Sequence, residues 1–336
     1  MGELKLINID KETNYDEWIS FRQNGLGASD VGTLMGLNPY KSKIELFYQK
    51  LGLIPIKQDE NIPMFYGTRL EEFVSNMWEY YDGEDPESVI RNYNAGTKIR
   101  HCREIKGYIT NSDYPHLFLS PDRLMVTKET DKLIYGGKLI SKNFKGVLEV
   151  KTINGFASKQ WEGGIPPSYV TQLQTYLFGL GVDYGEIVFL EDGRKLWTIP
   201  MEINYNLKDK IVSEMNEFMD RIAAAKADIE NVNLYEPEPD GTEAFEKFLN
   251  TKYANSESKT LQGSDEMFEI AIRHKVLSGE IKDMEGQHRE CSNILKNHMK
   301  EFEAIDFGEE KGKISWRTDS RGIRSLRNNV KLSSLG

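Results

Sequence analysis

Apolar residues recur at helical spacing in several parts of the chain. Residues 66–81 give the clearest case, because the i, i+3, i+4 pattern of an amphipathic helix is formed there by Leu70, Phe73, Val74, Met77 and Trp78. Capping residues add a second signal: Ser29-Asp30 can cap a helix, and Ser42 with Glu45 forms a capping box. We therefore predict helices over residues 31–35, 42–51, 66–81, 169–179 and 207–227.

Short runs rich in β-branched and aromatic residues alternate with turn residues in the middle of the chain. They predict strands over residues 89–93, 97–100, 105–110, 117–119, 123–126, 133–135, 146–151, 186–190 and 195–199. Asp192-Gly193 between the last two runs is typical of a hairpin turn. Helices on either side of this β-rich block predict an α/β core, in which helices flank a mixed sheet.

The pattern changes after residue 235. Residues 236–241 read Glu-Pro-Glu-Pro-Asp-Gly, which is a linker composition, so we divide the chain into 1–235, 236–263 and 264–336. Residues 264–303 carry a loose heptad that is compatible with a helical hairpin, a partner-binding arm or a core helix. A basic tail follows, in which residues 311–331 contain seven Lys and Arg residues and one Asp. We expect a mostly helical C-terminal extension whose tail contacts phosphate groups or an acidic partner.

Composition narrows the class of protein. The chain has 336 residues, a length that favours about two domains, and its net charge of −10 argues against a basic protein that coats DNA. Two cysteines, Cys102 and Cys291, are too few for a disulfide framework or a four-cysteine metal site. We find no long apolar run and no signal peptide, and we therefore expect a cytoplasmic protein without a membrane span.

One strand carries charges where apolar residues are expected. Glu149 and Lys151 lie in the run Val-Leu-Glu-Val-Lys, and because alternate strand residues share a face, both point to one side while Val150 points to the other. A carboxylate and an amine on a buried strand require compensating partners. Asp122, which follows Pro121 at the end of a neighbouring strand, supplies a second carboxylate.

Two carboxylates brought together repel each other unless a divalent cation lies between them. Carboxylate and carbonyl oxygens are the ligands that Mg²⁺ and Mn²⁺ prefer, and the Val150 carbonyl is a further candidate. Such an ion polarises a phosphodiester and activates water, while the ammonium of Lys151 positions the nucleophile or stabilises charge. Asp122, Glu149 and Lys151 thus predict metal-dependent phosphodiester cleavage.

These residues and their neighbours resemble a known family. Pro121-Asp122 followed by Glu149-x-Lys151 resembles the PD-(D/E)xK nuclease signature. Further segments resemble, in order, those of the YqaJ-like viral recombinases, the phage and prophage alkaline exonucleases similar to lambda exonuclease: RQNGLGASDVG, GLNPYKSKIELF, YGTRLEEF, LSPDRL, LEVKT and YVTQLQTYLFGLG. The resemblance covers about residues 15–200 and implies a restriction-endonuclease-like α/β core.

The resemblance also implies roles for individual residues. Asp122 and Glu149 would be metal ligands and Lys151 the catalytic lysine. Glu71 would reach the metal from its helix, directly or through water, with Glu72 as the competing position. Gln172 would lie beside the active site, and the neighbouring alternatives are Gln174 and Tyr176.

Other residues are candidates for DNA contact. By resemblance, Arg22 and Ser29 would bind the 5′-phosphate of a DNA end, with Ser120 near the same phosphate, although Ser29 could equally be an ordinary helix cap. Three lysines between Asp122 and Glu149 lie on a predicted long hairpin that would contact DNA or form a solvated edge: Lys138, Lys142 and Lys145.

The resemblance implies a Mg²⁺- or Mn²⁺-dependent 5′→3′ exonuclease that digests one strand of linear duplex DNA. The 3′ strand would pass to a phage single-strand annealing protein, and a homo-oligomer, for example a trimeric ring, would thread the DNA. Three alternatives stay open: an endonuclease of the same superfamily, a non-catalytic protein that binds DNA ends, and a protein that recruits a partner through residues 264–336.

Overall fold

The computed structural model describes residues 2–9, 14–56, 61–129, 133–135, 138–139, 143–158, 161, 164–256 and 258–331. The chain divides into two units, Met1–Asn255 and Ser256–Gly336. This division falls after the predicted linker, because the helix that follows the linker, α9 (Glu243–Lys252), buries Phe245 in the core of the first unit.

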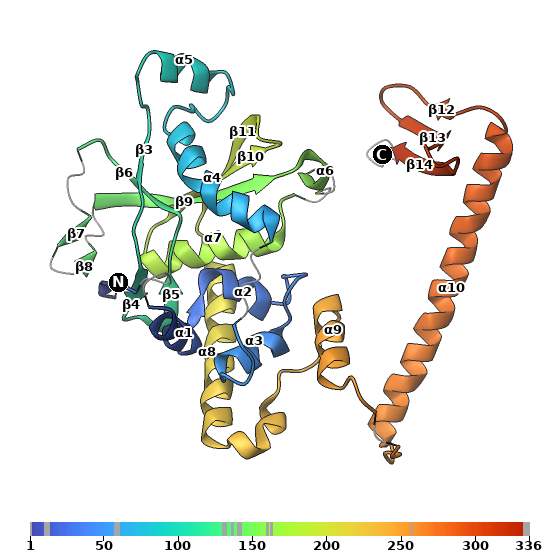
Figure 1. Ribbon diagram of the computed structural model, residues 1–336, viewed down its shortest axis with the longest axis horizontal. Helices are drawn as coiled ribbons and strands as arrows, with labels where there is room; N and C mark the ends of the chain where they lie inside the picture. Colours follow the sequence, from blue (N-terminus) through green and yellow to red (C-terminus); the bar gives the residue numbers. More distant parts are fainter. Residues whose placement is uncertain are drawn as a thin grey trace. The chain divides into compact units, whose positions relative to one another are not determined.

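A five-stranded mixed sheet forms the centre of the first unit (Figure 1). Its order is β11 (Lys195–Glu202), β10 (Tyr184–Glu191), β9 (Phe144–Ile153), β6 (Arg123–Val126) and β3 (His101–Arg103). β9 runs antiparallel to β6 but parallel to β10, so the chain crosses over between β9 and β10. The predicted α/β core with a mixed sheet is confirmed.

Two helices cover opposite faces of this sheet. α4 (Ile62–Trp78) packs Val74 and Trp78 against Leu148 and Val150. The crossover helix α7 (Pro167–Leu180) packs on the other face, with Leu173 and Leu177 in one cluster with Val147 and Ile187. Side chains of β9 alternate between the two faces, so Glu149 lies on the α7 face. It is thus on the opposite side from Val150, as the strand pattern predicted.

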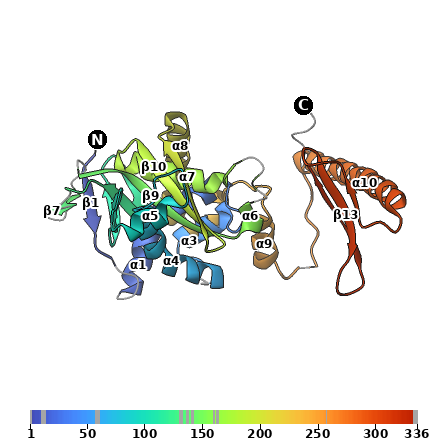
Figure 2. The same ribbon diagram turned by 90° about the horizontal axis from the view of Figure 1, so that it is seen from above.

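The remaining elements of the first unit extend this core. A second sheet has the order β2 (Leu26–Gly27), β5 (Tyr114–Leu119), β4 (Tyr108–Asn111), β1 (Leu4–Ile7), β8 (Lys138–Leu139) and β7 (Ile134–Tyr135). The other helical segments are α1 (Tyr15–Gln23), α2 (Ala28–Leu34), α3 (Lys43–Lys50), α5 (Ser88–Asn94), α6 (Gly155–Ser158), α8 (Tyr205–Ala227) and the 3-10 segment η2 (Ile229–Tyr235). α2 and α8 pack against α7, as Figure 2 shows for α8.

The second unit combines one long helix with a small sheet. α10 (Asp265–Met299) is a single helix, which excludes the helical hairpin among the three alternatives left open for residues 264–303. The predicted basic tail is not a tail but two strands of an antiparallel sheet ordered β12 (Ala304–Asp306), β13 (Gly312–Thr318) and β14 (Arg324–Val330). The C-terminal extension is therefore only partly helical.

Three local predictions need correction. Residues 89–93 form helix α5 rather than a strand, because Asp85 and Ser88 organise the preceding turn and Asn92 donates to the Tyr80 carbonyl. Residues 97–100 are not a strand. The cap of α2 is Gly27, not Ser29-Asp30: the helix begins at Ala28, and Asp30 accepts a hydrogen bond from the Gly27 N–H at 3.1 Å.

Several predicted boundaries hold within a few residues. The helices predicted over 66–81, 169–179 and 207–227 appear as α4, α7 and α8, and Ser42 caps α3 by accepting from the Glu45 N–H. No helix in the described part of the chain is long and apolar enough to cross a membrane.

Candidate active site

Asp122 joins the two strands on which the candidate site is built. It lies directly before β6, and its Oδ2 accepts a hydrogen bond of 2.7 Å from the backbone N–H of Val150 in β9. The carboxylate is therefore fixed beside the middle of β9. Its position next to the Glu149-Val150-Lys151 segment agrees with the spatial grouping predicted from the sequence.

Glu149 is almost fully buried, with 1 % of its surface exposed. Its Oε1 accepts hydrogen bonds from Lys151 Nζ and from Gln172 Nε2, each at 2.7 Å. Its Oε2 is also buried, yet it has no hydrogen-bond partner among the described residues. A buried carboxylate oxygen without a partner is costly, so Oε2 is available to bind a donor or a cation.

The electrostatics of the site favour a bound cation. Burial, together with the neighbouring charge of Asp122, raises the pKa of Glu149 to about 8. Burial also raises the pKa of Asp122, against the opposing effect of Lys151. Burial would lower the pKa of Lys151, but Glu149 and Asp122 together raise it above its ordinary value. Lys151 and Arg123 oppose the raised carboxylate pKa values, but the pKa values of Glu149 and Asp122 stay raised, so an additional positive charge would stabilise the ionised forms.

Glu71 rather than Glu72 belongs to this electrostatic group. Burial and the nearby Asp122 raise the pKa of Glu71 to about 7, and Lys151 acts on it in the opposite direction. Glu72 is exposed to solvent. The helix α4 thus presents Glu71 to the site and turns Glu72 away from it.

The donor set suits a hard divalent cation. Asp122, Glu149 and Glu71 would supply carboxylate oxygens, and Oε2 of Glu149 has no competing donor among the described residues. In the same described part of the chain, no three His, Cys, Asp or Glu side chains are arranged so that they could hold a metal ion, so the fit rests on ligand chemistry and on the orphaned oxygen. The residue types and the orphaned oxygen therefore fit Mg²⁺ or Mn²⁺. Whether the Val150 carbonyl takes part stays a prediction.

Gln172 is the glutamine of α7 that contacts the site. Besides its bond to Glu149, its Oε1 accepts from Lys151 Nζ at 3.4 Å. Gln174 instead bonds to the backbone of Glu202 and Asn204 and has a structural role. Tyr176, the other alternative, is buried and donates to the Ser120 carbonyl at 2.8 Å. The proximity of Glu149 contributes to raising the pKa of Tyr176 well above its ordinary value, after burial itself.

Arg22 and Ser29 converge on Gly27. A side-chain carbon at Gly27 would lie 3.6 Å from Arg22 Nη2 and 3.8 Å from Ser29 Oγ. Ser120, whose carbonyl is bonded to Tyr176, is exposed to solvent. Arg22 and Ser29 therefore both lie near Gly27, and their binding of a shared phosphate stays a prediction.

A cluster of cations surrounds Asp30, and the sequence alone did not reveal it. Asp30 Oδ2 lies 3.2 Å from Arg22 Nη2 and 2.9 Å from Lys50 Nζ, and Oδ1 lies 3.7 Å from Lys41 Nζ. Despite burial, these cations hold the pKa of Asp30 well below its ordinary value, while burial lowers the pKa of Lys50 to about 8. Three cations face one carboxylate, so the cluster has surplus positive charge for an anion.

The structure describes only part of the predicted long hairpin, so DNA contact by its lysines stays a prediction. Lys145 is exposed at the start of β9, and the backbone of Lys138 pairs with Lys5 of β1. The side chain of Lys138 and the whole of Lys142 lie outside the described residues.

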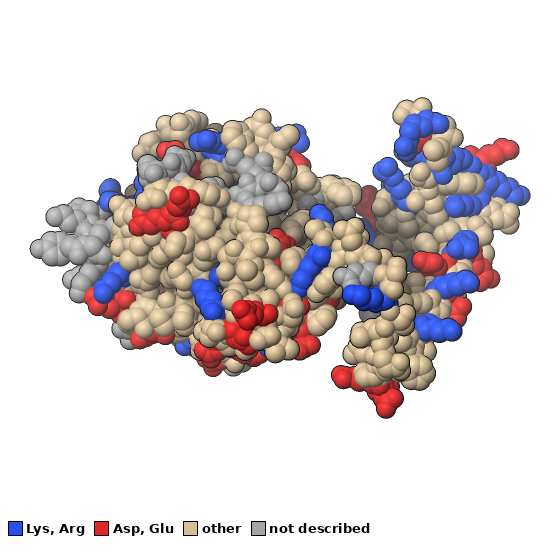
Figure 3. All heavy atoms as spheres, turned by 60° about the horizontal axis from the view of Figure 1, so that its bottom comes forward, with Lys and Arg blue, Asp and Glu red and all other residues tan. Residues whose placement is uncertain are grey.

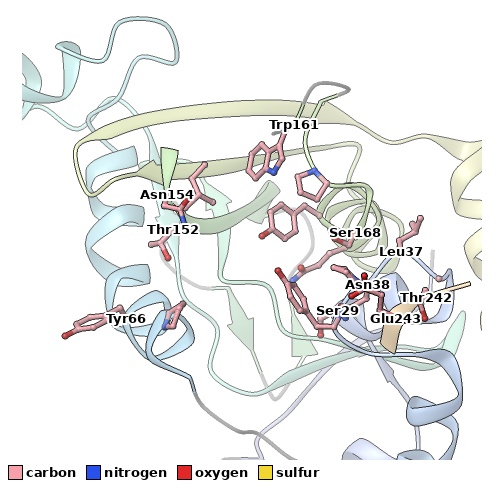
Figure 4. Close-up of a pocket in the computed structure, with 18 of the residues that line it drawn as sticks. Ser29, Leu37, Asn38, Tyr66, Thr152, Asn154, Trp161, Ser168, Thr242 and Glu243 are labelled. Atoms are coloured by element: carbon pink, nitrogen blue, oxygen red, sulfur yellow. The ribbon is translucent and has the colours of Figure 1, made fainter. Parts of the chain in front are cut away.

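A cavity of about 1150 Å³ opens beside the site (Figure 4). Gln172 and Tyr169 of α7 line it, and the Tyr169 ring centre lies 5.1 Å from Lys151 Nζ. Ser29 contributes to the wall, and Tyr66 and Trp161 add aromatic surface. The same cavity is therefore lined by Gln172, which contacts Glu149, and by Ser29, which lies near Arg22.

The fold and the site together define the class of protein. An aspartate before one strand and a Glu-x-Lys pair on the next, in a mixed sheet between α4 and α7, form a PD-(D/E)xK-type core. Residues 17–181 match the YqaJ-like viral recombinase domain, as the sequence motifs predicted. The matched segment contains all the candidate site residues discussed above: the carboxylates Glu71, Asp122 and Glu149, together with Lys151, Gln172, Arg22 and Ser29.

Three individual proteins are similar to this chain. The chain is 27% identical over 304 residues to the uncharacterized protein YqaJ of Bacillus subtilis. The aligned part covers 89% of this chain and 82% of that protein. An alkaline exonuclease from Laribacter hongkongensis is 19% identical with a TM-score of 0.45, over 65% of this chain and 98% of its own. A phage-related exonuclease from Haemophilus somnus is 12% identical with a TM-score of 0.37, over 60% and 95%.

Proposed function

We propose that this protein is a Mg²⁺- or Mn²⁺-dependent exonuclease that digests one strand of linear duplex DNA from its 5′ end. The observation that carries the proposal is the buried Glu149 beside Asp122. One of its oxygens is bonded to Lys151 and Gln172, and the other has no partner among the residues that the structure describes. The match of residues 17–181 to the YqaJ-like viral recombinase domain supports a DNA substrate.

Each residue of the site would have a separate role in cleavage. When bound by Asp122, Glu149 and Glu71, a divalent ion supplies Lewis-acid activation of the scissile phosphate and of water. Lys151, held by Glu149, positions the attacking water and compensates charge on the phosphate. Gln172 keeps the Glu149 carboxylate in one orientation through a 2.7 Å hydrogen bond.

The cation cluster would select the DNA end. A guanidinium group binds phosphate oxygens in a bidentate manner, and Arg22 lies within a group of three cations around a single carboxylate. Arg22 and Ser29 would hold a terminal 5′-phosphate, which would direct cleavage to that strand. An endonuclease would not require this selection.

The product would be a duplex with a 3′ single-stranded overhang. A phage-encoded single-strand annealing protein is the partner that would bind such a strand, in the cytoplasm of a bacterial host. A homo-oligomer, such as a trimeric ring around the DNA, would keep the enzyme on its substrate between cuts.

The test uses one linear duplex with a 5′-phosphate on one end, a 5′-hydroxyl on the other, and a different label on each strand. A covalently closed circle is incubated in parallel with Mg²⁺ or Mn²⁺. We expect loss of the 5′-phosphorylated strand and an intact circle. Cutting of the circle would instead identify an endonuclease, and no cutting with either metal would favour a protein that only binds DNA.

A further inference from the structure

The sheet of the second unit has two chemically different faces. β13 and β14 pair in antiparallel register, so alternate residues share a face. One face packs inward: Ile314 is 3 % exposed, and the Arg324 guanidinium lies 3.7 Å from the centre of the Trp316 ring. Arg324 also donates to the carbonyls of Lys300 and Phe302, at 2.8 and 3.0 Å, and therefore has a structural role.

The opposite face carries the basic residues. The register on this face opposes Lys313 to Asn329, Ser315 to Arg327, and Arg317 to Ser325. A cavity of about 460 Å³ over the face is lined by nine polar residues, of which four are Lys or Arg and one is Asp. In Figure 3, Lys and Arg side chains gather on this unit.

Two of the four cations in this lining have no ion-pair partner in the described part of the chain. Asp319 is paired with Arg321 at 2.7 Å, and Arg317 has only an exposed contact of 3.5 Å with Glu303. Arg327 and Lys313 have no carboxylate within ion-pair distance in the described part of the chain, and the cross-strand neighbour of Lys313 on β12 is Asp306. The lining thus has a surplus of cations, together with hydroxyl and amide groups that can donate hydrogen bonds.

The composition of the lining identifies the ligand. The centre of a protein–protein interface is usually apolar or aromatic, and this lining has no apolar side chain. Surfaces that bind single-stranded nucleic acid usually stack bases on aromatic rings, and none lines the cavity. Cations alternating with Ser and Asn instead suit the oxygens of a phosphodiester backbone.

We infer that this face of β13 and β14 is a second DNA-binding site, which holds the phosphate backbone of duplex DNA independently of the nuclease site. Each strand has seven residues and is roughly 20 Å long, enough to contact several phosphates. The inference rests on the proposed function only in taking duplex DNA as the substrate. Such a site would anchor DNA without reading its sequence or requiring an end.

The test is a binding measurement on the full chain in EDTA, where no metal-dependent cleavage occurs. The probe is a fluorescent duplex closed by hairpins at both ends, so that the proposed end-binding site has no substrate. We expect the Lys313→Ala, Arg317→Ala, Arg327→Ala triple variant to lose about tenfold or more in affinity at low salt. Its slope of log K against log salt concentration should fall by about 2–3, because three phosphate contacts are lost.

Matched control variants show whether the loss of DNA binding depends on the position of the removed charges or only on their number. Lys275→Ala, Lys282→Ala and Arg289→Ala remove the same charge from exposed positions of α10 and should leave the slope unchanged. Arg317→Lys with Arg327→Lys keeps the charge and should retain the salt dependence. Equal thermal unfolding curves for all variants establish that the sheet is intact.

Other outcomes would overturn the inference. A triple variant with wild-type affinity and slope would contradict it, and so would binding of single-stranded DNA in preference to the closed duplex. Failure of the wild-type chain to bind the closed duplex would also contradict it, even if linear DNA is digested. Binding of the closed duplex through this face without any cleavage of linear DNA would refute the proposed nuclease and leave this site supported.

Discussion

Lys151 Nζ lies 2.7 Å from Glu149 Oε1, two positions away on the same face of β9. The strand alternation itself creates this pair, because no loop or mobile segment separates the two residues. Since Lys151 and Gln172 both bind Oε1, the second oxygen of Glu149 is left for a different ligand. The pair thus holds a lysine beside a candidate metal position.

The two neighbouring glutamates of α4 should behave differently. Glu71→Gln should lower the rate of Mg²⁺-dependent cleavage by about 10–100-fold, the usual effect of weakening a metal site. Glu72→Gln is the matched control and should leave the rate near that of the wild type, because Glu72 is exposed. Equal losses in both variants, measured on a labelled linear duplex, would mean that Glu71 has no special role.

Stability without metal should depend on pH. The folded protein keeps a proton on Glu149 up to a pKa of about 8, whereas the unfolded chain releases it near the ordinary value of 4.5. Burial raises the pKa of Glu71 to about 7, in the same direction. Between these values the folded state binds more protons than the unfolded state, so the free energy of unfolding should fall as pH rises.

Mg²⁺ should reverse this loss, because it binds the ionised carboxylates. Thermal unfolding in EDTA and in Mg²⁺ at pH 5.5 and pH 8 tests both parts. We expect the increase in melting temperature caused by Mg²⁺ to be larger at pH 8. An equal increase at both pH values would show that the carboxylates do not form the metal site.

Arg22 should determine the preference for a 5′-phosphate. Arg22→Gln should reduce the ratio of digestion rates for 5′-phosphate and 5′-hydroxyl ends by about tenfold, the value of one charge-assisted contact. The fold should persist, because Lys50 still pairs with Asp30 at 2.9 Å. Arg91→Gln, at an exposed ion pair with Asp85, is the control and should keep the wild-type ratio.

Much of the site was predictable because it depends on strand alternation and on ordered motifs. The shared face of Glu149 and Lys151 and the proximity of Asp122 follow from residues that lie within or next to strands. The choice of Gln172 over Gln174 and of Glu71 over Glu72 required the structure. Each choice is decided by how a helix is rotated against the sheet.

Other features could not be predicted because tertiary contacts override local preference. The apolar run 89–93 has a strand-like composition, yet Asn92 and the turn at Asp85 hold it as helix α5. The cation cluster around Asp30 joins residues from α1, α3 and the loop before α3, which no sequence spacing links. The basic segment 311–331 becomes a sheet because Ile314 and Trp316 supply an apolar face.

Close packing of α7 on β5 makes Gly179 sensitive to substitution. A side-chain carbon there would lie 2.7 Å from Leu119 Cδ1 and 3.0 Å from Leu117 Cδ2. Gly179→Ala should therefore lower the free energy of unfolding by about 1–3 kcal/mol. Gly286→Ala, in α10 with open space around it, should raise local helix stability by up to about 1 kcal/mol. Chemical denaturation compares the two, and an unchanged Gly179→Ala midpoint would contradict this packing.

The central claim is that the cluster around Glu149 and Lys151 cleaves phosphodiester bonds. The most direct test measures Mg²⁺-dependent digestion of a 5′-phosphorylated linear duplex by the wild type and by Lys151→Ala, with circular dichroism to establish that both are folded. We predict that the folded variant loses about 100-fold or more of the rate, because the charge that positions the nucleophile is gone. A folded Lys151→Ala variant that digests DNA at the wild-type rate would contradict the account.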